Sequence, residues 1–377
     1  MAEYKTLVKK IPISPDKKTK QKDYLKKGQL PIVDQGQSLV GGYTDDANMT
    51  VECELPVIVF GDHTRAVKYI TFPFGAGADG IKVLQPKENI LPPFLYYGTQ
   101  YIVAKMPNRG YARHYQYVEK EDLPVPSLPE QERIVARIEE LFSQLDAGVE
   151  TLKKTKAQLS VYRQAAITEA FSVENNTPNV CLSDIAQIIG GITKGRDLPG
   201  TETIELPYLR VANVQNGYLD LSEIKTIKLR VDEKERYLLK PGDVLYTEGG
   251  DRDKLGRGTV WRGEIKDCVH QNHVFKARVD QSKAIPEYVA FWSMSTPARN
   301  YFYQKGKQSV NLASINKTVL SALTLPLPAL EKQREIINHI ESRLSVCDSI
   351  EQTVDTALQQ AEAMRQSILT QAFGGAL

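Results

Sequence analysis

The sequence predicts an α+β fold in which two globular domains are separated by two long antiparallel coiled-coil helices, related by a pseudo-twofold axis. Two observations predict this fold. The stretches LPVPSLPEQERIV (123–135) and LPLPALEKQREII (325–337) are nearly the same and lie 202 residues apart. Each follows a long stretch of a different kind, rich in glycine, proline, tyrosine and β-branched residues. Helical and globular segments therefore alternate along the chain.

The repeat continues well beyond these two stretches. Residues 123–171 align with residues 325–373 without a gap and are identical at 17 of 49 positions. Ordinary residue frequencies would give about three identities by chance. The copies end alike, in RQAAITEAF and RQSILTQAF. A gapless match of this length indicates a duplicated structural unit.

Apolar residues in both copies recur at alternating spacings of four and three, which is typical of the buried seam of a coiled coil. The prolines before each copy cannot continue a helix, and Pro129 suits a first turn, so each helix should begin here. A helix of about 40 residues would be about 60 Å long and needs a partner of equal length, which the other copy can provide. Gly148 interrupts the first seam where the second has Ile350, which indicates a kink, a close helix approach or a plain irregularity. The predicted seam residues are Ile134, Ile138, Leu141, Leu145, Leu152, Leu159, Ile336, Ile340, Ile350, Val354, Met364 and Ile368.

The segments before the helices are predicted to be compact α+β domains. Short strand-like runs are separated by turn signals such as GGYTDD and GGDRDKLGRG. The strand-like runs are LPVIVF (55–60), YLRVANV (208–214), DVLYT (243–247) and HVFKARV (273–279), and short helices are expected near 285–302 and 91–102. The predicted boundaries are 1–122 for the first globular domain, 123–174 for the first helix, 175–324 for the second globular domain and 325–377 for the second helix.

Composition and charge narrow the function classes. With 41% hydrophobic and 25% charged residues, no long apolar run and four scattered cysteines, the chain is typical of soluble cytoplasmic proteins without disulfides. The Lys-rich first 27 residues lack the apolar core of a secretory signal. The helical segments carry 10 basic and 15 acidic side chains, which leaves a net charge of +7 on the globular segments. This division favours nucleic acid at the domains and protein partners at the helices.

Polar side chains suited to base edges and phosphates gather in the predicted loops. Arginine pairs with guanine and asparagine or glutamine with adenine in the major groove, whereas lysine more often contacts phosphates. The candidates in the first domain are Gln35, Gln37, His63, Arg65, Arg109 and Arg113. Those in the second are Lys194, Arg196, Arg210, Asn213, Gln215, Arg252, Lys254, Arg257, Gln271, Asn272, Lys305, Lys307, Gln308 and Asn311.

Motifs for catalysis are weak. The stretch GAGADG (75–80) fits the GxGxxG pattern, but it precedes a strand-like run instead of a helix. The prolines of NILPPF (89–94) follow a leucine where an adenine methyltransferase would need an amide. His270 and His273 lack a third metal ligand, and Asp243, Glu248 and Lys254 have the wrong spacing for a nuclease. We therefore expect no catalytic residue, metal or cofactor in this chain.

The duplicated unit LPxPxLxxQ, followed by a long amphipathic helix that ends in RQ(A/S)xxTxAF, resembles the specificity subunits of type I restriction-modification systems. The resemblance covers the whole chain, with a target-recognition domain before each helix. The stretches QGQSLVGGYTDD, GAGADGIKVL and PGDVLYTEGG are similar to recurrent parts of such domains. The short first domain departs from the pattern, because it lacks a counterpart of VCLSDIAQIIGGITKG (180–195). Its Lys-rich tract either replaces this piece or is disordered.

The resemblance implies a non-catalytic subunit for DNA methylation and phage defence. Each recognition domain would read one half of a split site in double-stranded DNA through the major groove. The helices would set the distance between the halves and dock two modification methyltransferase subunits. Those partners would bind S-adenosylmethionine, and a restriction motor-nuclease subunit that uses ATP and Mg²⁺ could join them.

Two other functions remain open from the residues alone. One is a two-domain scaffold whose globular domains bind protein partners. The other is the recognition part of a different methyltransferase or nuclease system, which would need a catalytic domain from elsewhere.

Overall fold

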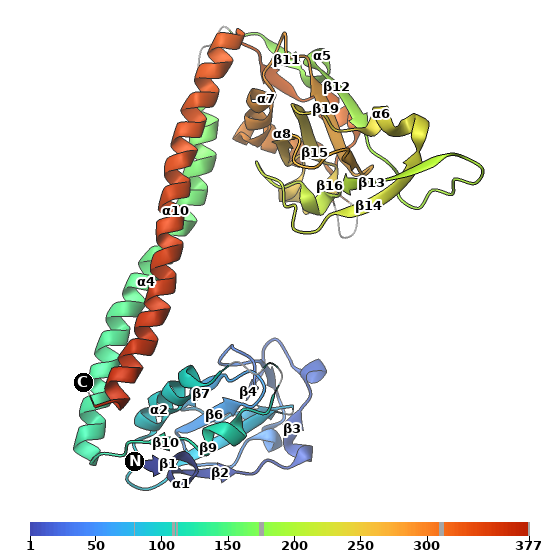
Figure 1. Cartoon of the computed structure of the whole chain (residues 1–377). Helices are drawn as coiled ribbons and strands as arrows, with labels where there is room; N and C mark the ends of the chain where they lie inside the picture. Colours follow the sequence, from blue (N-terminus) through green and yellow to red (C-terminus); the bar gives the residue numbers. More distant parts are fainter. Residues whose placement is uncertain (79, 108–109, 111, 173–176, 309–312, 376–377) are drawn as a thin grey trace. The chain divides into compact units, whose positions relative to one another are not determined.

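The computed structural model describes residues 1–377 except 79, 108–109, 111, 173–176, 309–312 and 376–377 (Figure 1). The chain divides into two compact units. The first unit comprises Met1–Lys153 and Asp355–Leu377, and the second comprises Lys154–Val354. Each unit therefore holds one globular domain, called here the first or second domain, together with a segment of each long helix.

The predicted long helices are α4 (Leu128–Ala170) and α10 (Leu330–Phe373). Within each unit their segments run antiparallel. In the second unit, Arg163 pairs with Asp348 at 2.6 Å, whereas Arg343 pairs with Glu169, also at 2.6 Å. As the residue numbers increase along α4, the numbers of the partner residues on α10 decrease. This confirms the predicted antiparallel pairing.

One cross-helix ion pair occurs once in each unit. Arg163 with Asp348 in the second unit corresponds to Arg365 with Asp146 in the first, because both residues shift by 202 positions. The guanidinium of Arg365 also lies over the ring of Phe142, 4.3 Å from its centroid. The sequence duplication is thus also a duplication of contacts.

The first domain is built on a four-stranded antiparallel sheet in the order β2-β9-β6-β7, with helix α2 packed against it (Figure 1). A second sheet has the order β3-β8-β4-β5. The strands are β1 (Ala2–Glu3), β2 (Val8–Ile11), β3 (Lys18–Thr19), β4 (Leu30–Val33), β5 (Gly42–Thr44), β6 (Val57–Gly61), β7 (Val67–Ile70), β8 (Gly75–Gly77), β9 (Ile81–Pro86) and β10 (Asp122–Leu123). The helices are α1 (Tyr4–Leu7), α2 (Pro92–Lys105) and α3 (Tyr115–Val118), with 3-10 turns at Pro15–Lys17, Gln21–Asp23 and Ala47–Met49.

The second domain repeats this arrangement with larger additions. Its main sheet has the order β12-β19-β15-β17, and its other sheets have the orders β14-β13-β18 and β16-β21-β20. The strands are β11 (Asn179–Cys181), β12 (Ala186–Gly190), β13 (Thr203–Leu209), β14 (Lys225–Arg230), β15 (Asp243–Thr247), β16 (Gly249–Gly250), β17 (Gly258–Val260), β18 (Val269–His270), β19 (Val274–Val279), β20 (Lys307–Gln308), β21 (Ala313–Ser314) and β22 (Thr324–Pro326). The helices are α5 (Leu182–Ile185), α6 (Lys234–Tyr237), α7 (Pro286–Met294), α8 (Thr296–Lys305) and α9 (Lys317–Ser321), with 3-10 turns at Val211–Asn213, Val231–Glu233 and Arg252–Lys254.

The start of the first domain has the same topology as the start of the second. In the first domain β1, α1 and β2 follow one another, and β2 forms the edge of the main sheet beside β9. In the second domain β11, α5 and β12 do the same beside β19. The Lys-rich tract therefore replaces the counterpart of residues 180–195 in the first domain. The alternative that it is disordered is wrong for the strands and helices it forms.

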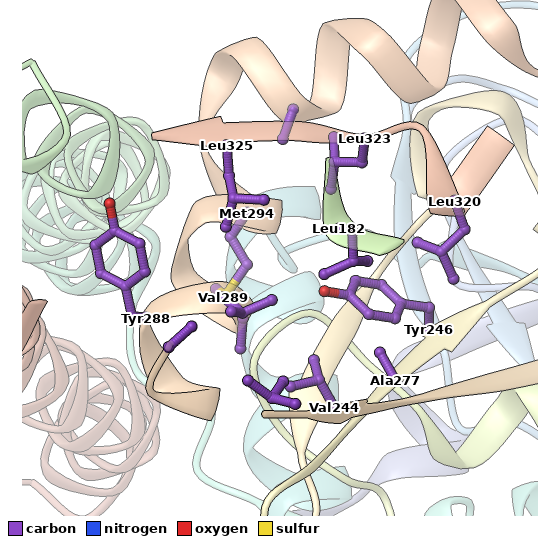
Figure 2. Packing of buried hydrophobic residues seen from close by; sticks show 14 of the residues in the cluster. Leu182, Val244, Tyr246, Ala277, Tyr288, Val289, Met294, Leu320, Leu323 and Leu325 are labelled. Carbon is purple, nitrogen blue, oxygen red and sulfur yellow. The ribbon is translucent and has the colours of Figure 1, made fainter. Parts of the chain in front are cut away.

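Each domain core continues into the long helices. In the second unit, Tyr246 of β15 and Val289 of α7 share one buried cluster with Ile167 of α4 and Ile340 of α10. Figure 2 shows the part of this cluster in which side chains of β15, β19 and α7 face those of α5 and β22. The core of the first domain likewise includes residues of both long helices, among them Ile138 and Phe373. Each domain is thus fixed to its helix segments by apolar burial.

Two of the predicted seam residues are not in the seam. Ile350 is 40% exposed and Met364 is 55% exposed, so the prediction is wrong for both. The positions that face the other helix are the next ones, Glu351 and Arg365, whose side chains are 39% and 31% exposed. Both are charged and form ion pairs across the helices. The apolar pattern therefore pointed one position away from the residues that face the other helix.

Gly148 does not mark a close approach of the helices. A Cβ atom added at this glycine would meet no described atom within 4 Å. Helix α4 continues as a helix through this position. Of the three possibilities left open by the sequence, the close approach is wrong.

Across the part of the chain that the structure describes, no helix combines the length and the apolar character needed to cross a membrane.

Candidate nucleic-acid interface

Loops predicted to contact DNA in the second domain meet at one end of the strands of its main sheet. Gln271 N–H donates a hydrogen bond to Leu209 O at 3.0 Å, and Asn272 N–H donates to Ile192 O at 2.9 Å. The turn between β18 and β19 is therefore joined to the loops that follow β12 and β13. Hydrogen bonds between backbone groups thus fix the positions of these loops. Their side chains can therefore differ from those of the first domain.

The loop after β15 lies at the same end of the strands. Glu248 N–H donates to His273 O at 2.9 Å, and Ile315 N–H donates to Glu248 O at 2.8 Å. Arg257 Nη1 donates to Gln215 Oε1 at 3.2 Å, which connects this loop with the loop after β13. The structure thus brings together candidates that lie far apart in the sequence.

Several candidates in this set are exposed and can reach a ligand. Arg252 lies over the ring of Tyr303, 4.4 Å from its centroid, and its Nε donates to the carbonyl of the same residue at 3.1 Å. This stacking orients the guanidinium while leaving the residue exposed. The exposed candidates of the second domain are Lys194, Arg252, Lys305, Lys307 and Gln308.

Other predicted cations are already paired within the domain. Arg196 donates to both carboxylate oxygens of Glu233 at 2.9 and 2.8 Å, and this contact holds the pKa of the Glu233 carboxyl below its usual range. Arg210 pairs with Glu223 at 3.0 Å. Lys254 pairs with Asp251. These side chains shape the loops, and part of their charge is neutralised before any ligand binds.

Asn213 is not available for base contact, so this prediction is wrong. Its side chain is 2% exposed. Its Oδ1 accepts from Arg210 N–H at 2.9 Å, and its Nδ2 donates to Asp220 O at 2.8 Å and Glu223 O at 3.1 Å. The predicted strand over 208–214 therefore ends at Leu209, and Asn213 holds the turn that follows.

The predicted loops of the first domain are joined in a similar way. Lys68 Nζ donates to Asp34 O at 2.7 Å, and Thr64 Oγ1 donates to Gln35 O. The loop after β4 is therefore attached to β7 and to the loop before it. Gln35 is half-buried in this contact.

Four further candidates of the first domain lie on these loops or near them. His63 Nδ1 lies 3.2 Å from Ala112 O, and Arg65 Nη1 donates to Met106 O at 3.4 Å. Gln37 and Arg113 are exposed. The remaining candidates, Arg109 and Asn311, lie outside the described residues.

Sequence reasoning missed two buried lysines: Lys68 supports the loop after β4, and Lys276 supports the end of α6. Lys68 is 4% exposed, and Lys276 is fully buried. Lys276 Nζ donates to Arg236 O at 2.8 Å and Leu238 O at 2.7 Å, and burial lowers its pKa to about 8. A single lysine inside the apolar strands VKYI and VFKARV is the sequence signal that could have found them.

His270 and His273 have separate partners. His270 is buried, and its Nδ1 lies 2.6 Å from Val274 O. His273 is exposed, and its Nδ1 lies 2.6 Å from Glu248 Oε2. Among the described residues, no group of three or more His, Cys, Asp or Glu side chains could hold a metal ion.

Acidification should destabilise the second domain through His270. Burial lowers the pKa of this imidazole from 6.5 to about 4, so the folded domain keeps it neutral where the unfolded chain binds a proton. The contribution of the neutral imidazole to the free energy of unfolding is fully present above pH 6.5. It is lost as the pH falls to 4, by up to about 3 kcal/mol. The variant H270N keeps a donor for Val274 O but does not titrate.

The measurement is denaturant unfolding followed by tryptophan fluorescence at pH 7 and pH 4.5. Trp261 and Trp292, the two tryptophans of the sequence, both belong to the second unit, so the signal reports on that unit. We expect wild type to lose more stability than H270N between the two pH values. An equal loss in both proteins would contradict the assignment.

Solved structures share this fold. A chain from a structure of a type I R-M system, solved in work on its complex assembly and conformational transition, aligns with a TM-score of 0.68 at 16% identity and covers 100% of this chain and 97% of that chain. The HsdS subunit from Thermoanaerobacter tengcongensis aligns with a TM-score of 0.50 at 16% identity, over 100% of this chain and 96% of that one.

Curated relatives have related sequences. The type I restriction enzyme StySPI specificity subunit of Salmonella potsdam is 27% identical over 274 residues, and the EcoKI specificity subunit of Escherichia coli strain K12 is 26% identical over 274 residues. Each match covers 68% of this chain and 58% of the relative, so the chain spans less than two thirds of their length. The EcoBI specificity subunit of Escherichia coli is 24% identical over 371 residues, which are 90% of this chain and 74% of that protein.

The family model described as the type I restriction modification DNA specificity domain matches twice, at residues 10–160 and 175–360. The two matches include most of the chain, with most of both globular domains and most of both long helices. The chain therefore belongs to the family of type I restriction-modification DNA specificity proteins.

Proposed function

We propose that this chain is the sequence-specific DNA-binding subunit of a type I restriction-modification complex. Each globular domain reads one half of a bipartite site in double-stranded DNA, and α4 and α10 fix the distance between the halves. The subunit is not itself catalytic. It acts in the cytoplasm, where the complex methylates host DNA and defends the cell against phage.

The observation that carries this proposal is a duplicated architecture with different loops. In both domains, loops that carry exposed candidate side chains lie at the same end of the strands of an equivalent sheet. The candidates there differ in kind, with Gln37 and Arg113 in one domain and Arg252 and Lys307 in the other. Two domains with equivalent sheets but different exposed side chains suit a DNA target whose two halves differ in sequence.

The chemistry of the exposed side chains suits a duplex. Lys194, Lys305 and Lys307 are exposed cations without a rigid planar group, which suits phosphate contacts that position the domain. Arg252 has a guanidinium oriented by Tyr303. Gln271 carries a half-buried amide on the turn between β18 and β19. These groups are suited to guanine and adenine edges in the major groove.

The long helices are the docking surface that we assign to two modification methyltransferase subunits. The helical segments carry more acidic than basic side chains, and Val346 is 58% exposed on α10. The partners bind S-adenosylmethionine and methylate one adenine in each half-site. A restriction subunit that uses ATP and Mg²⁺ completes the complex in systems that also cleave DNA.

The test is the methylation pattern of a host that carries this chain with its modification subunit. We expect a bipartite N6-methyladenine motif with a gap of fixed length. A contiguous motif would contradict the assignment of one half-site to each domain.

A further inference from the structure

A glutamine with a fully buried side chain lies in the first turn of each long helix. Gln131 of α4 and Gln333 of α10 are both 0% exposed, and they occupy equivalent positions of the duplication. A buried amide is costly unless its donors and acceptor find partners. Both side chains find three partners each, and all of these are backbone groups.

Gln131 joins three segments of the first unit. Its Oε1 accepts from Leu91 N–H at 2.9 Å. Its Nε2 donates to Asn89 O at 2.9 Å and to Pro126 O at 3.0 Å. One side chain therefore holds the loop between β9 and α2, the proline segment before α4 and α4 itself.

Gln333 makes the same three contacts in the second unit. Its Oε1 accepts from Ile285 N–H at 2.8 Å. Its Nε2 donates to Lys283 O at 3.0 Å and to Pro328 O at 2.8 Å. Pro328 is the duplicate of Pro126, and the carbonyl partner again lies two residues before the N–H partner. Two surroundings with little sequence in common thus keep one bonding pattern.

The glutamines cap a helix other than their own. Leu91 precedes α2 and Ile285 precedes α7, and neither has a side chain that can cap the helix. In a capping box the acceptor for the N–H of this residue comes from the third helical position, but that position holds Phe94 in α2. The amide oxygen of Gln131, from a different helix, takes this role.

This contact couples the direction of two helices. The start of α2 or α7 is tied through backbone groups to the first turn of α4 or α10, so neither helix can rotate without breaking a buried hydrogen bond. The apolar contacts of Ile134 and Ile138 hold the domain on the helix but are not directional. Hydrogen bonds with defined geometry supply the direction.

We propose that Gln131 and Gln333 are positioning residues that set the angle of each recognition domain on the spacer and so determine the permitted gap between half-sites. The inference rests on the proposed function. The bases in each half-site are read elsewhere, so loss of either glutamine changes the gap and leaves the half-site sequences intact.

The variants Q131L and Q333L keep the approximate volume and remove all three hydrogen bonds. We expect a host with either variant to methylate the wild-type half-sites also at gaps one base pair longer or shorter. Relative to wild type, methylation at these gaps should rise about tenfold, which corresponds to about 1.4 kcal/mol. Single-molecule methylation mapping in the host that carries the modification subunit measures it.

The matched controls are Q158L and Q360L, which are also duplicates of each other and are exposed on the long helices. They should keep the single wild-type gap. The variants Q131E and Q333E keep an acceptor for the capping contact but lose at least one of the two hydrogen bonds donated by Nε2, and the gap should broaden in them as well. These variants also serve if the leucine variants do not fold.

The outcomes separate this inference from the proposed function. Folded glutamine variants with an unchanged single gap would overturn the inference while leaving the function intact. Failure of both the leucine and the glutamate variants to fold would also overturn it, because the contact would then serve folding. A wild-type host without a bipartite motif would instead overturn the proposed function.

Discussion

Exchange of residues 175–324 for the second recognition domain of another family member will replace one half of the methylated motif and leave the other half unchanged. The second domain has two buried clusters made only of its own residues. Its ends are adjacent, because β11 pairs with β22 in the register Asn179 to Pro326 and Val180 to Leu325. A foreign domain can therefore be joined at one place without disturbing the first domain.

The size of this effect follows from the energetics of base readout. Each mismatched base pair typically costs about 1–3 kcal/mol, so a half-site with several changed bases is no longer recognised. Methylation mapping of hosts with the wild-type and the exchanged chain measures the change. Exchange of residues 1–122 is the matched control and should alter only the opposite half. If both halves change after a single exchange, the two domains do not read independently.

Insertion of seven residues into each long helix, after Lys153 in α4 and after Val354 in α10, will abolish use of the wild-type gap and favour a longer one. Seam residues such as Leu145, Leu152 and Leu159 recur every seven positions, so a heptad keeps them on one face. Each helix gains about 10 Å, which equals about three base pairs of duplex.

The control for this change is a seven-residue insertion in α4 alone. It moves the cross-helix partners out of register, including Arg163 with Asp348, and should abolish methylation altogether. In the variant with insertions in both helices, the methylated motif should keep the sequences of both wild-type half-sites. A variant that still prefers the wild-type gap would show that the helices do not set the spacing.

The sequence predicted the long helices well because the duplication made their pattern visible twice. It was wrong at Ile350 and Met364 because the positions that face the other helix there, Glu351 and Arg365, are charged and partly exposed. Arg163 and Glu351 neutralise each other across the helices at 2.9 Å. A search for apolar spacing cannot see a seam that is closed by ion pairs.

The domains were harder to predict than the helices. The equivalence of β1, α1 and β2 with β11, α5 and β12 rests on sheet topology, and their residues have little in common. At the candidate interface, the Asn213 amide has the donor and acceptor needed to bind a base. Both are already bonded to backbone groups of the turn that begins at Arg210. The contacts of Gln131 are made to backbone groups, which carry no sequence signal.

The central claim is that this chain determines a two-part DNA target. The most direct measurement is base-resolution methylation mapping of a host with its modification subunit, before and after deletion of this chain. We expect one bipartite N6-methyladenine motif with a fixed non-specific gap, which disappears on deletion and returns when the gene is restored. Absence of such a motif in the intact host, or its persistence after deletion, would show that this chain does not determine the target.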